Sequence, residues 1–360
     1  WVTQEGTTKG PLDAFCSDAV QMSRVGTTTF DTTAVVEMTC MNSYTVLSFM
    51  DVTAPTVQTA FAVNFPLLAN GQFSLSSNKI DLTFSEPVEQ ASAEVAGNYA
   101  FSGPVTRSVI SAIRDLSALN VVHLTLNSAI SSNAGFYNIT VTNVKDVATP
   151  QNTIVANGTT NVGSFFIQRV AFNGDFTIGL CNGTFAAADT FAIEGSLSPL
   201  TISPLRDNAL MYDANADSIY DVTVPFCMSK NPNTGTAEAD LEWKFSHQTQ
   251  GYEPRAGNRL YHLSSANGAS VALNESWNDD NPANFTSHPI DVIFQVNAAL
   301  FNPTGSNVIT LLGTYNPLSF TQPGLPMLDN GVPPDVASGD KIYTARVRFP
   351  VCTPKNVNWK

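Results

Sequence analysis

An acidic loop near the middle of the chain has the residue types and spacing of a cation site. The stretch DANADSIYD runs from residue 213 to residue 221. Alternating carboxylate and amide oxygens on a tight loop suit calcium, so this loop is a candidate calcium site. It lacks the glycine and the bidentate glutamate of an EF-hand, and the alternative is a solvated turn in which Asp and Asn bond to the backbone. The candidate ligands are Asp213, Asn215, Asp217 and Asp221.

The sequence gives little evidence of catalytic activity. The chain has no HExxH, no GxSxG, no P-loop and no dinucleotide fingerprint. No histidine stands beside an obvious nucleophile, and the carboxylate pair of a glycosidase converges only in the folded chain. We therefore expect a protein that is not an enzyme and has no catalytic residues. The histidines are His123, His247, His262 and His288.

The cysteines follow no CxxC spacing, so a zinc site is not indicated. In an extracellular protein the local pairs would be Cys16 with Cys40 and Cys181 with Cys227. Cys352 is then left over, either as a free buried thiol or as a bond to another chain. The sequence alone does not fix this connectivity.

Five Asn-x-Ser/Thr sequons would carry sugar only in a host that glycosylates its proteins. Several are expected by chance in a chain so rich in Thr and Asn. They are Asn138, Asn157, Asn182, Asn274 and Asn284.

The composition indicates an extracellular protein rich in β-structure. Charged residues make up 13% of the chain, hydrophobic residues 43%, and the formal net charge is −13. A negative chain does not suit nucleic acids or anionic membranes. No apolar run approaches the roughly 20 residues of a membrane span. The chain begins at Trp1 without a signal peptide, so we expect either a processed N-terminus or a cut boundary.

Strands must position these residues. One pair of strand-like segments occurs twice in the sequence. YDVTVPFC and LEWKF, within residues 220–245, return as YTARVRFPVC and NVNWK within residues 343–360. Polar and apolar residues alternate in both copies, which predicts half-buried antiparallel strands. A phrase that occurs twice predicts two related domains. The matched residues are Tyr220 with Tyr343, Cys227 with Cys352, and Trp243 with Trp359.

Upstream of the repeat, short alternating strands with frequent turns predict a β-sandwich. The phrases are LTFSEPV at 82–88, NY at 98–99, VVHLTL at 121–126 and YNITVTNVKD at 137–146. In these phrases the segment resembles the bacterial Ig-like module of S-layer and other cell-surface proteins. The resemblance implies a spacer or adhesive module without a catalytic site.

From residue 166 onward, the repeated phrases follow the order glycine turn, D-x-x-Y strand and W-K strand, and Glu253 with Asn258–Arg259 closes the first copy. This order resembles tandem starch-binding-type carbohydrate-binding modules, which implies Ig-like β-sandwiches. Sugar-binding members stack aromatic rings on glucose from the glycine turn and a nearby loop. Trp277 and Tyr315 are the candidate carbohydrate residues here, while Trp243 and Trp359 are expected to pack in the core.

The predicted fold is all-β, a multi-domain chain of Ig-like β-sandwiches with an N-terminal strand-rich segment. About 50 residues with a few strands are marginal as an independent domain, so we expect the N-terminal segment to lean on a neighbour or a partner. The expected parts are residues 1–50, 51–165, 166–288 and 289–360.

The second copy ends at Trp359–Lys360, before a counterpart of the closing strand RLYHL at 259–263. Either the sequence has been cut, or residues 1–50 of another subunit supply the strand, locked by Cys352. Repeated head-to-tail addition of this kind builds a fibre. We therefore expect a non-catalytic, extracellular structural or adhesive protein of the cell surface, whose partners are other copies of itself. The alternative is a starch- or glucan-binding protein, or the non-catalytic part of a glycan-degrading enzyme.

Overall fold

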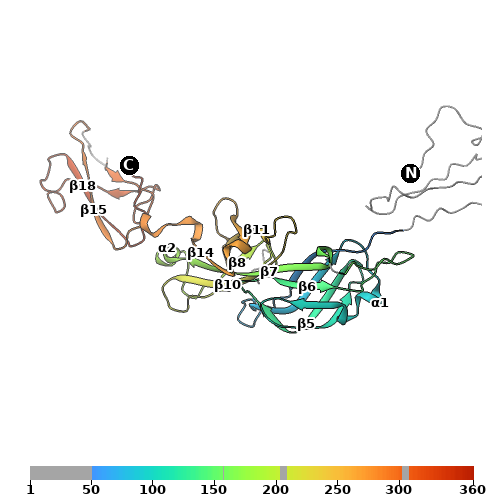
Figure 1. Ribbon diagram of the computed structural model, residues 1–360. Helices are drawn as coiled ribbons and strands as arrows, with labels where there is room; N and C mark the ends of the chain where they lie inside the picture. The colour runs from blue at the N-terminus through green and yellow to red at the C-terminus, as the bar shows by residue number, and fades with distance from the viewer. Residues whose placement is uncertain (1–50, 157, 203–208, 302–307) are drawn as a thin grey trace, which may run out of the picture.

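The computed structural model describes residues 51–156, 158–202, 209–301 and 308–360. Strands dominate and helices are short, which confirms the all-β prediction. Figure 1 shows three parts in sequence: a first β-sandwich, a second one joined to it by shared strands, and a smaller C-terminal body. The predictions for residues 1–50, including those for Cys16 and Cys40, lie outside the described residues.

The first sandwich packs two sheets face to face. Its elements are β1 (Val57–Val63), β2 (Ser76–Phe84), α1 (Gln90–Ala93), η1 (Ala96–Asn98), β3 (Tyr99–Ser102), β4 (Val109–Arg114), β5 (Val121–Ser131) and β6 (Tyr137–Val141). One sheet is antiparallel in the order β1-β2-β5-β4. Alternate residues of β2 and β5, such as Ile80, Leu82, Val122 and Leu124, are buried in the core, as period-two alternation requires.

Two long strands belong to both sandwiches. After η2 (Thr159–Asn161), β7 (Val162–Asp175) pairs antiparallel with β10 (Ile219–Ser229) over the whole length of β10. Along its other edge, β7 pairs first with β6 and then, in parallel, with β14 (Ser270–Ser276). The second sandwich therefore continues the sheet of the first without a linker.

The two faces of β7 cover different cores. Phe165 and Ile167 are buried in the first sandwich, whereas Phe166, Val170 and Phe172 are buried in the second. Successive residues of a strand point to opposite faces, so this one sheet is a wall of both sandwiches. A division between residues 165 and 166 falls inside this continuous strand.

The second sandwich is closed by a sheet in the order β12-β11-β8-β9, with β13 also paired to β11. Its remaining elements are α2 (Thr177–Cys181), β8 (Phe191–Gly195), β9 (Leu210–Met211), β11 (Glu238–His247), β12 (Gly251–Tyr252), β13 (Arg259–Ser264) and η3 (Ser265–Asn267). Aromatic rings fill the core. Phe172 meets Trp243 edge-on at 4.9 Å, and the rings of Phe176 and Phe191 lie 3.9 Å apart.

The C-terminal body is small. It follows η4 (Trp277–Asp279) and η5 (Pro282–Asn284) and consists of β15 (Ile290–Asn297), β16 (Thr310–Leu311), β17 (Leu325–Pro326) and β18 (Ile342–Phe349). β15 pairs with β18, and β16 with β17. Its core contains Phe294, Leu311, Leu318, Met327, Ala345, Val347 and Phe349.

Two matched residues of the sequence repeat make similar strand contacts. Trp243 pairs with Gly195 in the second sandwich, and Trp359 forms the equivalent bridge to Gly313 in the C-terminal body. Each glycine is followed four residues later by the proline of a cis bond, Ser198–Pro199 and Asn316–Pro317.

Packing explains the glycine of both turns. A Cβ atom on Gly195 would lie 2.8 Å from the side chain of Leu200, and one on Gly313 would lie 2.7 Å from that of Leu318. A Cβ atom at these distances would force the leucine to shift, because the leucine after each cis proline packs directly over the glycine. The two copies share this packing of a leucine over a glycine, although little of their sequence is identical.

Candidate functional site

The candidate calcium loop lies between β9 and β10. The carboxylate of Asp213 accepts hydrogen bonds from the backbone N–H groups of Asp217, at 3.1 Å, and Ser218, at 2.9 Å. The carboxylate of Asp217 accepts one from the N–H of Ile219 at 2.8 Å. These are the bonds of an Asx-rich turn, which is the alternative to an ion site.

The other two candidate ligands of this loop make no such bonds to the backbone N–H groups of Ser218 and Ile219. The Asn215 amide donates to Asp217 at 2.9 Å, whereas Asp221 lies exposed in β10. Calcium binding by Asp213, Asn215, Asp217 and Asp221 stays a prediction.

The second copy of the repeat builds the same turn. Asp329 accepts from the backbone N–H groups of Gly339 and Lys341, and Asp340 accepts from that of Ile342 at 2.8 Å. An insertion adds Asp335, and carboxylate oxygens of Asp329, Asp335 and Asp340 lie within 4.8 Å of one another. The sequence did not predict this group of three carboxylates, because Asp329 lies in a different segment from Asp335 and Asp340.

A second group of three carboxylates lies in the first sandwich. Oxygens of Asp51, Glu86 and Asp146 also lie within 4.8 Å of one another. Burial, together with the charges of Asp51 and Asp146, raises the pKa of Glu86 to about 7. These residues are far apart in the sequence, and no local signal could have found them.

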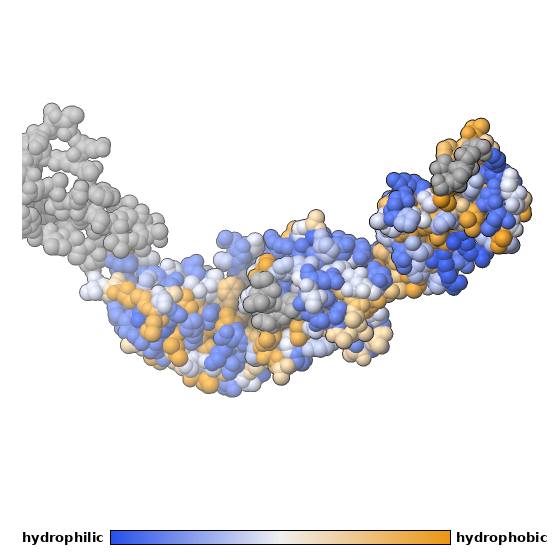
Figure 2. All heavy atoms as spheres, turned by 180° about the vertical axis from the view of Figure 1, so that it is seen from behind, coloured by the Kyte–Doolittle hydropathy of each residue, from blue (hydrophilic) through white to orange (hydrophobic). Residues whose placement is uncertain are grey.

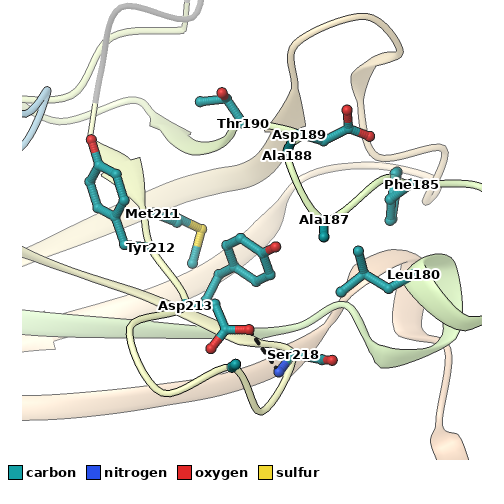
Figure 3. A pocket seen from close by; sticks show the side chains of 12 residues that line it. Leu180, Phe185, Ala187, Ala188, Asp189, Thr190, Met211, Tyr212, Asp213 and Ser218 are labelled. Carbon is teal, nitrogen blue, oxygen red and sulfur yellow. Dashed lines mark hydrogen bonds between the residues drawn. The ribbon is translucent and has the colours of Figure 1, made fainter.

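A hollow of about 580 Å³ opens beside the candidate calcium loop, between α2 with its following segment and the stretch from β9 to β10. Figure 3 shows Asp189 and Asp213 on opposite walls, with Leu180 and Phe185 on one side and Met211 and Tyr212 on the other. The hollow is also lined by Tyr220 and Ser218. Acidic and hydroxyl groups therefore face an apolar floor.

The carboxylate of Asp189 is held by several donors. It accepts from the backbone N–H of Ala186 at 2.8 Å and from the Gln248 amide at 3.0 Å, and Nε2 of His247 lies 3.0 Å away. Nδ1 of His247 accepts backbone N–H groups of Thr249 and Gln250. The Ala186 N–H, and then His247, hold the pKa of Asp189 below its ordinary value.

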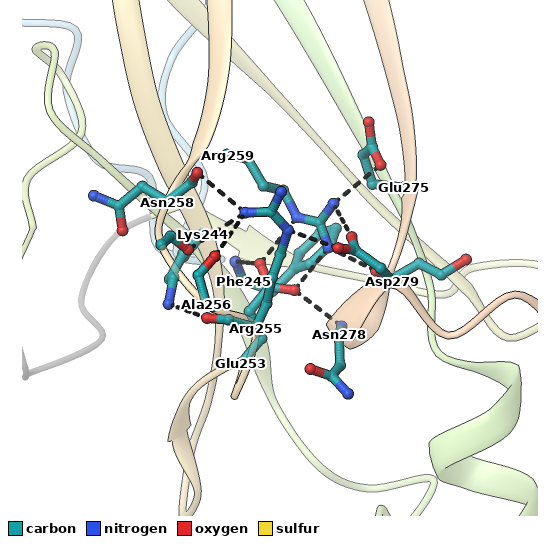
Figure 4. Close-up of polar contacts among 12 residues, drawn as sticks. Lys244, Phe245, Glu253, Arg255, Ala256, Asn258, Arg259, Glu275, Asn278 and Asp279 are labelled. Atoms are coloured by element: carbon teal, nitrogen blue, oxygen red, sulfur yellow. Dashed lines mark hydrogen bonds and ion pairs between the residues drawn. The ribbon is translucent and has the colours of Figure 1, made fainter.

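A buried ionic network surrounds Arg259, one of the residues that carried the resemblance to carbohydrate-binding modules. Figure 4 shows its guanidinium between Glu253 on one side and Glu275 and Asp279 on the other. It donates to both oxygens of Glu253, at 2.9 and 2.8 Å, and lies over the Trp243 ring at 5.4 Å. The Glu253 side chain is fully buried. The network joins β13 to the segment that leads into the C-terminal body, so its role is structural.

The candidate carbohydrate residues differ in exposure. Trp277 is only 6% exposed, and its ring packs against Phe176 at 5.7 Å and Phe185 at 5.1 Å. The prediction that it stacks on a sugar is therefore wrong, because the ring belongs to the core. Tyr315 is exposed at the glycine turn, and sugar binding by it stays a prediction.

The two strand tryptophans also differ. Trp243 is buried as predicted, whereas Trp359 is exposed and covers one edge of Phe294 at 5.1 Å. The prediction of core packing is thus correct for Trp243 and wrong for Trp359.

The cysteines pair across two parts of the chain. Cys181, at the end of α2, forms a disulfide with Cys352 of the C-terminal body, with 6.0 Å between their Cα atoms. Cys227 is free. The predicted pair of Cys181 with Cys227 is therefore wrong, and Cys352 is neither free nor bonded to another chain. Cys227 lies on the face of β10 toward the first core, where its Sγ accepts the Ala62 N–H at 3.0 Å.

Three sequon asparagines, Asn182, Asn274 and Asn284, are exposed. Asn138 is partly buried and accepts a bond from Ser164, and Asn157 lies outside the described residues. Glycosylation at all five stays a prediction.

Of the remaining histidines, His288 contacts the hydroxyl of the neighbouring Ser287 at 3.2 Å, and the other two sit among carboxylates. His123 lies between Asp81 at 2.7 Å and Asp115 at 3.1 Å, and His262 lies 2.7 Å from Asp240. These contacts raise the pKa of both imidazoles. They are surface ion pairs of neighbouring strands and loops.

Comparison with known proteins gives a distant likeness only. No family model matches the sequence, and no curated protein matches it. The N-terminal part of the bacterial S-layer protein SbsC is similar at 13% identity and a TM-score of 0.21, over 61% of this chain and 44% of that one. The S-layer protein rSbsC(31-844) is similar at 12% identity and a TM-score of 0.21, over 83% of this chain and 51% of that one.

A third structure, of domains 1–6 of surface layer protein SbsC, is similar at 10% identity and a TM-score of 0.21, over 83% of this chain and 51% of that one. The chain thus spans about half the length of these SbsC structures. None of the described helices has the length and hydrophobicity needed to cross a membrane.

Proposed function

We propose that this chain is a non-catalytic structural subunit of an extracellular surface assembly, in which its sandwiches act as a rigid spacer. The observation that supports this most is that β7 and β10 each contribute to two hydrophobic cores. A bend between the sandwiches would break strands whose hydrogen bonds continue through the junction. Domains joined only by a linker move relative to one another, whereas these cannot do so without unfolding.

Further contacts brace the junction between the sandwiches. The segment after β1 reaches the second sandwich, where the Gly71 carbonyl accepts the Leu210 N–H at 2.8 Å. Phe73, from the same segment, is buried in the second core. Two separate parts of the first sandwich therefore hold the second in place.

The C-terminal body is tied on by backbone hydrogen bonds and by the disulfide. The Thr286 N–H donates to the Thr353 carbonyl at 2.9 Å, and the Cys352 N–H donates back to the Thr286 carbonyl at 2.8 Å. The Cys181–Cys352 bond fastens the same strip to α2. A covalent tie beside a hydrogen-bonded linker suits a protein that transmits mechanical load.

We infer further that copies join at the edge of β15. Within the described residues β15 pairs with β18 alone, whereas its counterpart β7 has partners on both edges. Ile290, Ile293 and Val296 of β15 are between 36% and 49% exposed, and Figure 2 shows hydrophobic residues at the surface of this body. An exposed apolar strand edge invites the addition of another strand. The strand we propose comes from residues 1–50 of the next copy, which would build a head-to-tail fibre.

Electron microscopy and light scattering of the purified chain test both parts of the proposal. We expect filaments of stiff rods that lengthen with concentration. Ile293→Lys should shorten or abolish them, because a charge on the β15 edge opposes strand addition. Ile110→Lys is the matched control, since Ile110 is an equally apolar, 60% exposed residue of β4, an edge strand of the first sandwich.

Each part can fail separately. A chain that stays monomeric at every concentration would overturn the fibre but leave the spacer intact. Small-angle X-ray scattering that shows free hinge motion between the two sandwiches would overturn the spacer.

A further inference from the structure

The edge of β15 has a counterpart in the second sandwich where the neighbouring strand is present. Two residues after the matched tyrosines, Phe294 of β15 pairs with Ala345 of β18, and Phe172 of β7 pairs with Val222 of β10. Phe172 and Phe294 thus occupy equivalent places, and both are buried in their cores. What covers the edge of β7 beside Phe172 therefore indicates what the edge of β15 needs.

β14 shows what a strand on this edge contributes. It runs parallel to β7, with Val271 beside Val170 and Leu273 beside Phe172. Val271 and Leu273 pack against the second core, and the two β7 residues beside them are fully buried. A strand of seven residues with apolar side chains at alternate positions is therefore enough to cover this edge.

The core side of β15 is only partly covered. Ile290 and Val296 lie on the face of β15 that carries Phe294 into the core, yet they are 36% and 37% exposed. In the part of the chain that the structure describes, β15 pairs with β18 alone. The edge of β15 thus lacks the apolar cover that β14 gives to β7.

The opposite face of the same two strands is basic. Arg346 and Arg348 of β18 are exposed on it, and Arg346 pairs with Ile293 of β15. Basic residues outnumber acidic ones in residues 289–360, whereas acidic residues outnumber basic ones in residues 1–50. A strand that fits this edge is therefore apolar toward the core and acidic toward the arginines.

Residues 33–39, TAVVEMT, have the pattern that both faces require. Ala34, Val36 and Met38 are apolar and alternate with other residues, one of which is Glu37. In a strand the three apolar side chains point to one face and Glu37 points to the other.

We propose that residues 33–39 of the next copy form the strand on the edge of β15, with Val36 on the core side and Glu37 on the side of Arg346. This inference rests on the head-to-tail joint of the proposed function and names its donor strand. The charge also sets the register, because a slip by one residue would turn Glu37 into the core.

A second alternating stretch of the N-terminal segment suits the edge less well. Residues 44–50, YTVLSFM, are apolar on both faces and carry no charge, and they run directly into Asp51. Residues 40–50, by contrast, give the strand 33–39 a tether that spans up to about 36 Å when extended. The strand can thus leave its own copy.

The test is the binding of a synthetic peptide to the whole chain. The peptide comprises residues 31–41 with Cys40→Ser and a fluorescent label. The receptor is the full chain with Val36→Asp, which disables its own strand and keeps β15 open. We expect a saturable rise in fluorescence anisotropy.

Neighbouring residues of the peptide supply a matched pair of variants. The Val36→Asp peptide should bind on the order of a hundredfold more weakly, because its carboxylate would enter the core without a partner. The Val35→Asp peptide should bind as the parent peptide does, since that side chain lies on the exposed face with the arginines.

A charge exchange tests the basic face. Arg346→Glu in the receptor should weaken binding of the parent peptide about fivefold, and the Glu37→Lys peptide should recover the loss. Lys145→Glu is the control, because Lys145 is an exposed residue of the first sandwich, and it should leave the affinity unchanged.

The proposal fails if the peptide does not bind, or if Val35→Asp and Val36→Asp weaken its binding equally. Light scattering separates this failure from that of the fibre. Filaments formed by the chain with Val36→Asp would refute residues 33–39 as the donor but leave the fibre intact. Peptide binding, with a parent chain that forms no filaments, would support the strand site but overturn the fibre.

Discussion

Phe165 and Phe166 are neighbours in β7, but their side chains are buried in two different hydrophobic cores. The sheet that β7 forms with β10 therefore cannot leave one sandwich without opening the other. This couples the stability of residues on either side of the junction. Two sandwiches linked in this way should unfold as one unit.

Phe166→Ala tests that coupling. The substitution opens a cavity in the second core and should cost about 3–5 kcal/mol of unfolding free energy. We expect a single thermal transition for both sandwiches, at a lower temperature, and faster amide hydrogen exchange in β5 of the first sandwich as well as in β11 of the second.

Leu116→Ala is the control for this experiment, because Leu116 is 83% exposed. It should leave the transition unchanged. Two separate transitions in the parent chain would contradict the coupling.

Alternation along the strands was enough to predict the all-β fold. It places Tyr220 and Val222 on one face of β10, and that is where the structure has them. Alternation gives the face of a residue but not the strand that pairs with it. The junction between the two sandwiches was not predicted for this reason. Nothing in the sequence of β7 indicates that β6 and β14 pair along the same edge of it.

Contacts between residues far apart in the sequence also determine which predicted site residues lie together. Cys227 is close to Cys181 in sequence, but its thiol faces the first core, so it cannot reach the end of α2. Trp277 stands in a polar stretch typical of a loop, and only the rings of Phe176 and Phe185 make it a core residue. The hollow beside α2 was equally hidden, because Asp189 and Asp213 come to line one space only in the folded chain.

Cys181→Ser should loosen the C-terminal body. The bond closes a loop of 171 residues, and disulfides of this kind contribute about 2–4 kcal/mol. We expect the C-terminal body to melt earlier and small-angle scattering to show a broader range of lengths. Cys227→Ala serves as the control, since Cys227 is free and its side chain packs against the first core. Identical scattering of the Cys181→Ser and parent chains would show that the backbone bonds of Thr286 suffice.

Cys227 should resist thiol reagents in the folded chain. Burial raises the pKa of its thiol to about 12, and the Ala62 N–H only partly offsets this. At pH 8 about one thiol in ten thousand would then be thiolate, which is the reactive form. Peptide mass spectrometry after treatment with iodoacetamide should find Cys227 unlabelled until denaturant is added. Rapid labelling of the native protein would mean that the junction opens.

Glu86 should make the first sandwich less stable at alkaline pH. Its pKa of about 7 in the folded chain lies above the ordinary value of 4.5. The stability from its bound proton is present below pH 4.5 and is lost as the pH rises through about 7. Glu86→Gln mimics the protonated form, so it should raise the melting temperature at pH 8 and change it little at pH 4. An equal gain at both pH values would show that the pKa of Glu86 is not raised in the folded chain.

Removing the charge of Arg259 should destabilise the second sandwich strongly. Arg259→Met keeps much of the stem but leaves Glu253, whose side chain is fully buried, without its guanidinium. Breaking a buried ion pair from one side costs about 3–5 kcal/mol of unfolding free energy. We expect a large fall in the chemical denaturation midpoint.

Arg348→Met is the matched control for Arg259→Met. Its guanidinium lies 3.9 Å from Asp291, and its side chain is 71% exposed. Exposed pairs of this kind contribute little, so the midpoint should stay close to that of the parent chain. The double variant Arg259→Met with Glu253→Met should recover part of the loss, because it leaves no unpaired buried charge. A double variant as unstable as the single one would instead assign the loss to the stacking of Arg259 on Trp243.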